Sequence, residues 1–302
     1  MADKIWDIVL LTDNRYIHPK PESEYVSNVF LEDFLVANAL TDKGLTVTRL
    51  SWDDPFMDWS TTKYALFRST WDYFDRFEEF QTWFEKANLQ TIFINSYPLV
   101  QWNLNKNYLA ELEEKGIRIP PTVFLKKGDK RTLNEIISDS VWKKIILKPA
   151  VSGAARHTYA FENDEISAFE AIFQSLILNE DMLLQEFQTE IETRGEVSLM
   201  VIGGKFSHAV LKKAKAGDFR VQDDFGGSVH AYDPSETEIR FAEKAVSLCF
   251  EFPIYARVDV MWNNEGELCL SELEMIEPEM WFRRKPEAAI LLAEAIVENF
   301  GL

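Results

Sequence analysis

Three carboxylates near the C-terminus have a spacing that suits a metal ion. Asp259, Glu272 and Glu274 lie on two expected strands, 255–262 and 268–275, joined by a turn. Because side chains alternate along a strand, Glu272 and Glu274 share one face, and the turn sets Asp259 opposite Glu272 to within about one residue pair. Clustered like charges repel, and oxygen ligands without His or Cys favour Mg²⁺. The alternative is a solvated hairpin in an acidic protein. A nearby base and a set of apolar residues typical of a buried sheet favour the metal site: Arg257, Val258, Val260, Leu270 and Leu273.

A loop of small residues upstream suits a phosphate. Lys148 ends an expected strand, and the sequence PAVSGAAR follows at 149–156. Small side chains let backbone N–H groups approach phosphate oxygens, and Arg156 adds a positive charge. The loop alone is weak evidence, because small-residue loops are usually turns and this one lacks the Gly-Lys-Ser/Thr run of a P-loop. Its weight comes from its place between Lys106 and the acidic strands.

The first third of the chain alternates strands with helices, which indicates a parallel sheet covered on both faces. Ligands of such sheets collect beyond the carboxyl ends of the strands, and the segment RSTWDY, 68–73, falls there. We expect Arg68 to bind a carboxylate, Asp72 an ammonium group, and Trp71 to form an apolar wall. The alternatives are aromatic residues that cap the core and an Arg68–Asp72 pair that ties the loop down. The expected strands are 7–12, 46–52, 64–68 and 91–95, and the expected helices are 24–43 and 77–87.

The remainder of the chain is predicted to form two further α+β units. The paired prolines Pro120 and Pro121 mark a connector after a helix expected at 105–115. This divides the chain into units 1–105, 106–190 and 191–302. Strands are expected at 122–125, 144–148, 157–161, 182–187, 196–202 and 205–211, helices at 165–178, 234–252 and 286–300, and an irregular segment at 212–227.

Composition excludes several classes of partner. The formal net charge of −18 argues against nucleic acid and anionic membranes, because both require a basic surface. The sequence shows neither a signal peptide nor a long apolar span. Cys249 and Cys269 lie in apolar segments and are expected to be reduced buried thiols, which fits the cytoplasm. The four histidines are scattered, so a catalytic triad has no support.

The order of these motifs resembles that of the ATP-grasp ligases. The likeness rests on Lys106 in WNLNKNYL, Lys148 in ILKPAVSGAARHT, the hinge segment LLQEFQTEI, and RVD followed thirteen residues on by ELE. The phrases WDDPFMDW, RSTWDY, GDFRVQDDFGG and ELEMIEP are similar to the branch that holds bacterial glutathione synthetase and the cyclo-ligase that closes the D-cycloserine ring. The resemblance covers nearly the whole chain.

The resemblance implies a fold and a set of roles. The fold would be an N-terminal open parallel sheet that helps bind substrate, followed by two α+β lobes that clamp ATP. Because relatives are dimers, the resemblance also favours a homodimer. Two departures stand out: many relatives have Asn in place of Glu274, and the loop at 152–156 has a single glycine. The implied ATP contacts are Lys106, Lys148, Ser152, Gly153 and Arg156 at the phosphates, Gln185, Glu186 and Phe187 at the adenine, and Glu190 at the ribose; Lys212 and Arg220 would lie near the transferred phosphate, and Asp259, Glu272 and Glu274 would hold Mg²⁺.

The implied activity is ATP- and Mg²⁺-dependent formation of a carbon–nitrogen bond. ATP would convert a carboxylate into an acyl phosphate, a nitrogen nucleophile would attack it, and Arg257 would stabilise the oxyanion. The substrate would be small and amino-acid-like, and the reaction either intramolecular or, as in dipeptide and glutathione synthesis, intermolecular. A small-molecule phosphotransferase and a non-catalytic nucleotide-binding protein remain alternatives.

Overall fold

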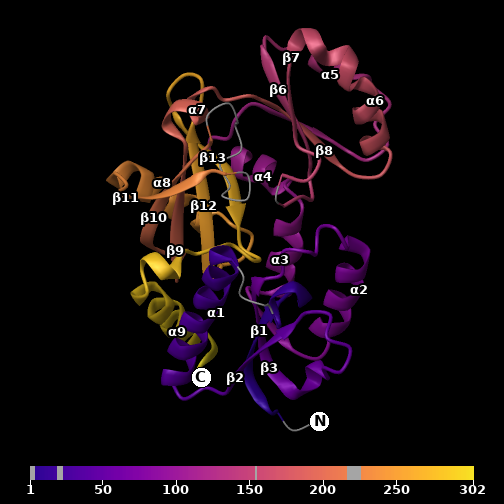
Figure 1. Ribbon diagram of the computed structural model, residues 1–302. Helices are drawn as coiled ribbons and strands as arrows, with labels where there is room; N and C mark the ends of the chain where they lie inside the picture. Colours follow the sequence, from indigo (N-terminus) through magenta and orange to yellow (C-terminus); the bar gives the residue numbers. More distant parts are fainter. Residues whose placement is uncertain (1–3, 19–22, 154, 216–225) are drawn as a thin grey trace.

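The computed structural model describes residues 4–18, 23–153, 155–215 and 226–302. Within these ranges the chain forms three sheets, one parallel and two antiparallel (Figure 1). The parallel sheet comes first along the sequence, as the alternation of strands and helices predicts. The two antiparallel sheets carry the remaining motifs, so the mixed α/β and α+β prediction is confirmed.

The N-terminal sheet has the strand order β2-β1-β3-β4, with all neighbours parallel. Alternation along β1 decides which helix each side chain meets. Ile8 and Leu10 pack towards helix α1, whereas Val9 and Leu11 pack towards helix α2. Helices therefore cover both faces. The elements are β1 (Trp6–Thr12), α1 (Glu24–Asp42), β2 (Val47–Ser51), β3 (Thr62–Ser69), α2 (Phe77–Asn88) and β4 (Ile92–Ile94).

The last helix of the chain returns to this N-terminal sheet. Helix α9 (Glu287–Phe300) lies beside α1 in Figure 1, and its residues Leu292 and Ile296 belong to the same core as Ile8. Lys43 and Glu294 add an ion pair of 2.9 Å between the two helices. The two ends of the sequence thus share one hydrophobic core, which holds the N-terminal sheet against the C-terminal part.

The central sheet has the strand order β5-β8-β6-β7 and is antiparallel. Ile145, Leu147 and Leu184 pack against helices α5 and α6. Alternation turns Lys148 and Gln185 to the opposite face of the sheet. The elements are β5 (Thr122–Leu125), α5 (Leu133–Ile137), β6 (Lys144–Pro149), β7 (Tyr159–Glu162), α6 (Ile166–Ile177) and β8 (Met182–Glu186).

The third sheet has the strand order β11-β10-β9-β12-β13. One face is apolar: Val258 and Val260 of β12 pack with residues of helices α8 and α4. The other face carries Arg257 and Asp259. The elements are α3 (Tyr97–Leu104), α4 (Tyr108–Glu114), α7 (Glu190–Arg194), β9 (Glu196–Ile202), β10 (Lys205–Lys213), β11 (Ser228–Tyr232), α8 (Glu236–Ser247), β12 (Tyr255–Trp262) and β13 (Leu268–Glu274), with 3₁₀ turns at Asn14–Tyr16, Trp59–Thr61, Asn163–Glu165 and Phe282–Arg284.

Several expected elements differ from the observed ones. Lys106 does not lie in a helix: Asn105 is extended and its side chain accepts a hydrogen bond from the Asn107 backbone, so α3 ends before it and α4 begins after it. Lys212 belongs to β10 rather than to an irregular segment. The sequence analysis also missed helices α3, α5 and α7 and strand β11, and α5, α7 and β11 have only five residues each, too few to show a period.

Among the described residues, no helix has the length and apolar character needed to span a bilayer. Cys249 and Cys269 are free thiols; burial raises the pKa of each to about 12, and Cys269 is fully buried.

Candidate active site

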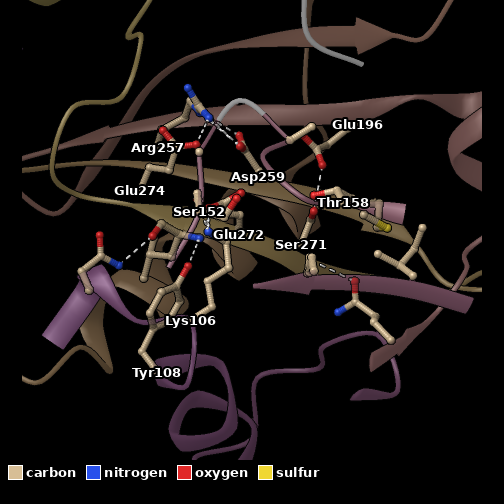
Figure 2. Close-up of a pocket in the computed structure, with 18 of the residues that line it drawn as sticks. Lys106, Tyr108, Ser152, Thr158, Glu196, Arg257, Asp259, Ser271, Glu272 and Glu274 are labelled. Atoms are coloured by element: carbon tan, nitrogen blue, oxygen red, sulfur yellow. Dashed lines mark hydrogen bonds and ion pairs between the residues drawn. The ribbon is translucent and has the colours of Figure 1, made fainter. Parts of the chain in front are cut away.

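A cavity of about 240 Å³ lies between the central and third sheets. The polar faces of both sheets line it, because alternation has placed the apolar side chains on the outer faces with the helices. Figure 2 shows the side chains that converge there from the linker, the central loop and the acidic hairpin. The lining includes the basic residues Lys106, Lys148, Lys212 and Arg257 and the acidic residues Glu196, Asp259, Glu272, Glu274 and Glu277.

The hairpin of β12 and β13 has the predicted register. Asp259 pairs with Glu272, and Arg257 pairs with Glu274. The Arg257 guanidinium forms ion pairs with both Asp259, at 2.9 Å, and Glu274. Burial raises the pKa of the Glu274 carboxyl to about 7, although Arg257 opposes this shift. The arginine therefore joins two of the three candidate metal ligands.

A second basic residue reaches Asp259 from β10, across the intervening strand β9. Lys212 of β10 lies 3.1 Å from Asp259 Oδ2 and also pairs with Glu196, its cross-strand neighbour on β9. Ser198 Oγ is 2.5 Å from Asp259 Oδ1. Burial opposes ionisation of Asp259, but Arg257 and Lys212 outweigh it and lower the pKa of the carboxyl to about 2. Asp259 is thus ionised and held on both oxygens.

Two further lysines come from outside the third sheet. Lys106, in the linker between α3 and α4, lies 3.0 Å from Glu272 Oε1 and 2.6 Å from the Ser152 carbonyl. Lys148 of β6 donates to Gln185 Oε1 at 3.2 Å, and burial lowers the pKa of its amine. Burial opposes ionisation of Glu272, but Lys106 and Lys148 lower the pKa of its carboxyl. The two lysines expected at the phosphates, Lys106 and Lys148, therefore face one cavity with the acidic hairpin.

The small-residue loop reaches the cavity through only part of its length. Ser152 and Gly153 line the cavity, whereas Arg156 binds Glu180 and the Val151 carbonyl within its own lobe. A Cβ on Gly153 would lie 2.4 Å from Cε1 of Phe74, an aromatic residue of the N-terminal unit. The single glycine is thus required for this close approach.

The hinge segment also lines the cavity. Gln185, Glu186 and Phe187 follow one another along its wall, and the backbone N–H groups of Glu186 and Phe187 donate to Pro121 and Lys144. Glu190, the expected ribose contact, begins helix α7 just beyond. Arg220 lies outside the described residues.

The expected substrate residues do not converge on this cavity. Arg68 is 3% exposed, pairs with Asp33 at 3.3 Å, and with Trp71 borders a second cavity of about 10 Å³. Asp72 instead accepts hydrogen bonds from Trp52 and Arg76. The Arg68–Asp72 pair that the sequence analysis weighed as an alternative is therefore not formed.

Sequence reasoning missed two residues that line the large cavity where the N-terminal unit borders it, Tyr73 and Glu277. Tyr73 belongs to RSTWDY and lies close enough to the Glu277 carboxyl to affect the pKa of that group. The Trp71 indole donates to the Glu277 backbone carbonyl at 2.9 Å. The signal was present in two motifs, RSTWDY and ELEMIEP, but nothing in the sequence indicated that they meet.

The donor chemistry of the hairpin can be compared with the needs of Mg²⁺, which takes oxygen ligands. Glu272 and Glu274 fit, because within the described ranges each uses only Oε1 in an ion pair. Asp259 has both oxygens engaged. Accordingly, no three acidic, His or Cys side chains of the described residues are grouped as they would be around an ion. Glu272 and Glu274 would hold the metal, and ligation by Asp259 stays a prediction.

A parallel sheet followed by two antiparallel lobes that enclose a cavity of lysines and carboxylates defines the class of ATP-grasp ligases. The RimK-like ATP-grasp domain family matches residues 106–278, and the family of the N-terminal domain of D-cycloserine synthetase matches residues 8–95. This chain belongs to the RimK-like ATP-grasp family. It is an ATP-dependent ligase of the kind that forms carbon–nitrogen bonds.

Three similar proteins illustrate the range of the family. The cycloserine biosynthesis protein DcsG of Streptomyces lavendulae is 25% identical over 274 residues, which cover 85% of this chain and 89% of the relative. The probable alpha-L-glutamate ligase 2 of Pseudoalteromonas atlantica is 25% identical over 198 residues, 62% of this chain and 61% of the relative. The crystal structure of D-cycloserine synthetase DcsG superposes with a TM-score of 0.85 at 24% identity, over 97% of this chain and 99% of that chain.

Proposed function

We propose that this ligase joins a carboxylate to an amine in a small amino-acid-like substrate, with an acyl phosphate as the intermediate. The observation that carries the proposal is the meeting of Lys106, Lys148, Lys212 and Arg257 in one cavity with the acidic hairpin. These bases offset the charge of ATP phosphates, and each already has an acidic or amide partner that a phosphate oxygen would replace.

The reaction follows from this arrangement. A carboxylate oxygen of the substrate attacks the γ-phosphorus of ATP and ADP leaves; the amine then attacks the acyl carbon, phosphate leaves, and the amine proton passes to solvent. Bound Mg²⁺ would offset the charge of the phosphate oxygens. Arg257 carries a fixed positive charge beside the hairpin and would stabilise the oxyanion of the tetrahedral intermediate. Lys106 and Lys148 would hold the phosphates.

We propose three functional units: residues 1–105 as the substrate unit, 106–190 as the central ATP-binding lobe, and 191–302 as the lobe with the metal site. The hinge at Gln185 to Phe187 borders the cavity on the side of the central lobe, which supports adenine binding there. Arg68 and Trp71 border a separate small cavity, so we assign the acceptor to the end of the large cavity where Tyr73 lies.

We favour a reaction within one molecule, because this chain matches the cycloserine biosynthesis relative over most of both lengths. Mass spectrometry of the product separates the two cases. Ring closure gives the mass of one substrate less one water, whereas intermolecular ligation gives the summed mass of two substrates less one water.

The test is ADP formation with Mg²⁺, ATP and a panel of amino acids and O-substituted serines. A ligase releases ADP only with its substrate, and added hydroxylamine intercepts the acyl phosphate as a hydroxamate. A phosphotransferase would release ADP and give a stable phosphorylated product without hydroxamate. Nucleotide binding without ADP release for any member of the panel would count against catalysis.

A further inference from the structure

Glu277 differs from the neighbouring carboxylates of the cavity in having no basic partner. Glu196 and Asp259 pair with Lys212, Glu272 pairs with Lys106, and Glu274 pairs with Arg257. Within the described part of the chain, no Lys or Arg forms an ion pair with Glu277, which is only 9% exposed. Tyr73, which lines the same cavity, is a near neighbour of its carboxyl and lowers the pKa of that group slightly.

A buried carboxyl without a counter-ion is unfavourable, because burial disfavours the charged form. Burial, followed by repulsion from Glu274, raises the pKa of Glu277 to about 8. Two aromatic residues border this group: the Trp71 indole donates to the Glu277 backbone carbonyl at 2.9 Å, and Tyr73 lines the cavity near the carboxyl. Both aromatic residues come from the N-terminal unit, so the position of Glu277 is set by tertiary contacts and not by the hairpin alone.

Glu277 lines the same cavity as the groups that would bind the nucleotide, and Tyr73, Glu274 and Lys106 face it. Tyr73 reaches the cavity from the N-terminal unit, whereas Lys148 and Gln185 line it from the central sheet. The lysines and Arg257 can serve the phosphates and a substrate carboxylate. Among the described residues, Glu277 is thus the carboxyl beside the acidic hairpin that lines the cavity without a basic partner.

We infer that Glu277, which lies beside Tyr73 and whose backbone carbonyl accepts from Trp71, is the binding subsite for the positively charged amine of the substrate. An ammonium group supplies the missing counter-ion and two or three N–H donors, while the ring of Tyr73 offers an aromatic neighbour. This inference rests on the proposed function and deepens it. It names the residue that would select a substrate with an amine over a neutral or acidic substrate.

The experiment compares amines with matched compounds that lack the amine. The probes are D-serine, L-serine and O-ureido-serine, each paired with the acid in which hydrogen replaces the amino group. Binding is read from the shift of the unfolding midpoint in the presence of Mg²⁺ and a non-hydrolysable ATP analogue. The wild-type protein is expected to bind at least one amine at least about tenfold more tightly than its partner compound.

Glu277→Gln should remove this preference while the stabilisation by the nucleotide analogue alone stays unchanged. Glu277→Asp keeps the charge and should retain part of the preference. The matched control is Glu238→Gln, because Glu238 is also buried and accepts a hydrogen bond from a tyrosine, Tyr232 Oη at 2.7 Å, but lies outside the cavity. This control should keep the full preference.

Three outcomes would overturn the inference: an unchanged preference in Glu277→Gln, equal binding of amine and desamino probes to the wild type, or no stabilisation by any amine. ADP release is measured separately. A protein that prefers amines but releases no ADP would contradict the proposed function and still support the amine subsite. ADP release at equal rates with the amine and with its desamino partner would support the proposed function and contradict the amine subsite.

Discussion

Lys106 Nζ lies 3.0 Å from Glu272 Oε1 and 2.6 Å from the Ser152 carbonyl, so one lysine joins the linker, the acidic hairpin and the small-residue loop. This relationship depends on the break between α3 and α4, which frees Lys106 from a helix. The Lys106 side chain is 9% exposed and lines the cavity. Figure 2 shows it next to Glu272.

We expect Lys106→Met to reduce ADP release by about 100-fold or more, because a fixed positive charge at the transferring phosphate is lost. The protein should remain folded, since Met keeps the aliphatic volume. Lys126→Met is the control: Lys126 also forms an ion pair, with Asp181 at 3.1 Å, but is largely exposed and outside the cavity. Equal activity of the two variants would remove Lys106 from the catalytic machinery.

Asp259 and Glu272 should separate structural from chemical roles. The Asp259 side chain is 2% exposed and holds both Arg257 and Lys212, whereas the Glu272 side chain is 31% exposed. Asp259→Asn is expected to lower the free energy of unfolding by about 3–5 kcal/mol, because two buried bases lose their charged partner. Glu272→Gln should cost little stability and shift the Mg²⁺ dependence of ADP release to higher concentration. Urea unfolding and a magnesium titration measure the two effects; near-normal magnesium dependence in Glu272→Gln would contradict the metal assignment.

Glu277 should make stability fall as pH rises. Its folded pKa of about 8 lies above the ordinary glutamate value of 4.5, so the folded state binds an extra proton between these pH values and loses this stabilisation as pH rises towards 8. The groups that face it are Tyr73, Glu274 and Lys106. We therefore expect Glu277→Gln to be more stable than wild type by a few kcal/mol at pH 8, with little difference at pH 4.5. Chemical unfolding at several pH values tests this; parallel profiles would show that Glu277 is not buried as described.

Gly153 should control the position of the small-residue loop. Gly153→Ala places a methyl group 2.4 Å from Cε1 of Phe74, so either the loop or the ring must move. We expect weaker binding of the ATP analogue, by about tenfold, with little change in overall stability because the loop is short. The double variant Gly153→Ala with Phe74→Leu should recover binding. Failure of the second change to restore affinity would mean that the methyl group acts in another way.

Arg68 should act mainly on stability. Its guanidinium is buried against Asp33, over the ring of Phe282, and one nitrogen, Nη1, has no hydrogen-bond partner. Arg68→Ala is expected to lower the unfolding midpoint while the affinity for the ATP analogue stays unchanged. A raised KM for the substrate identified by the panel, without a loss of stability, would instead support the carboxylate-binding role that the sequence analysis assigned to it.

The sequence by itself determined most of the strands, the longer helices and the polar face of the hairpin strands. Alternation in Tyr255–Trp262 and Leu268–Glu274 fixed the pairing of Asp259 with Glu272, and the strand and helix periods fixed the parallel sheet. These features are local, because a period of two or of 3.6 residues is visible within one segment. The order of Lys106, Lys148, the hinge and the hairpin was then enough to indicate the family.

Only the tertiary structure decided which side chains meet. Arg156 and Asp72, expected at the phosphates and the substrate, are held by Glu180 and Arg76, while Glu196 and Glu277, which drew no attention in the sequence, line the cavity. Partners of this kind lie far apart along the chain, as Tyr73 and Glu277 do, and are brought together by the packing of whole units. No period or spacing records such a contact, because it depends on how the N-terminal sheet, held by α1 and α9, is placed against the hairpin.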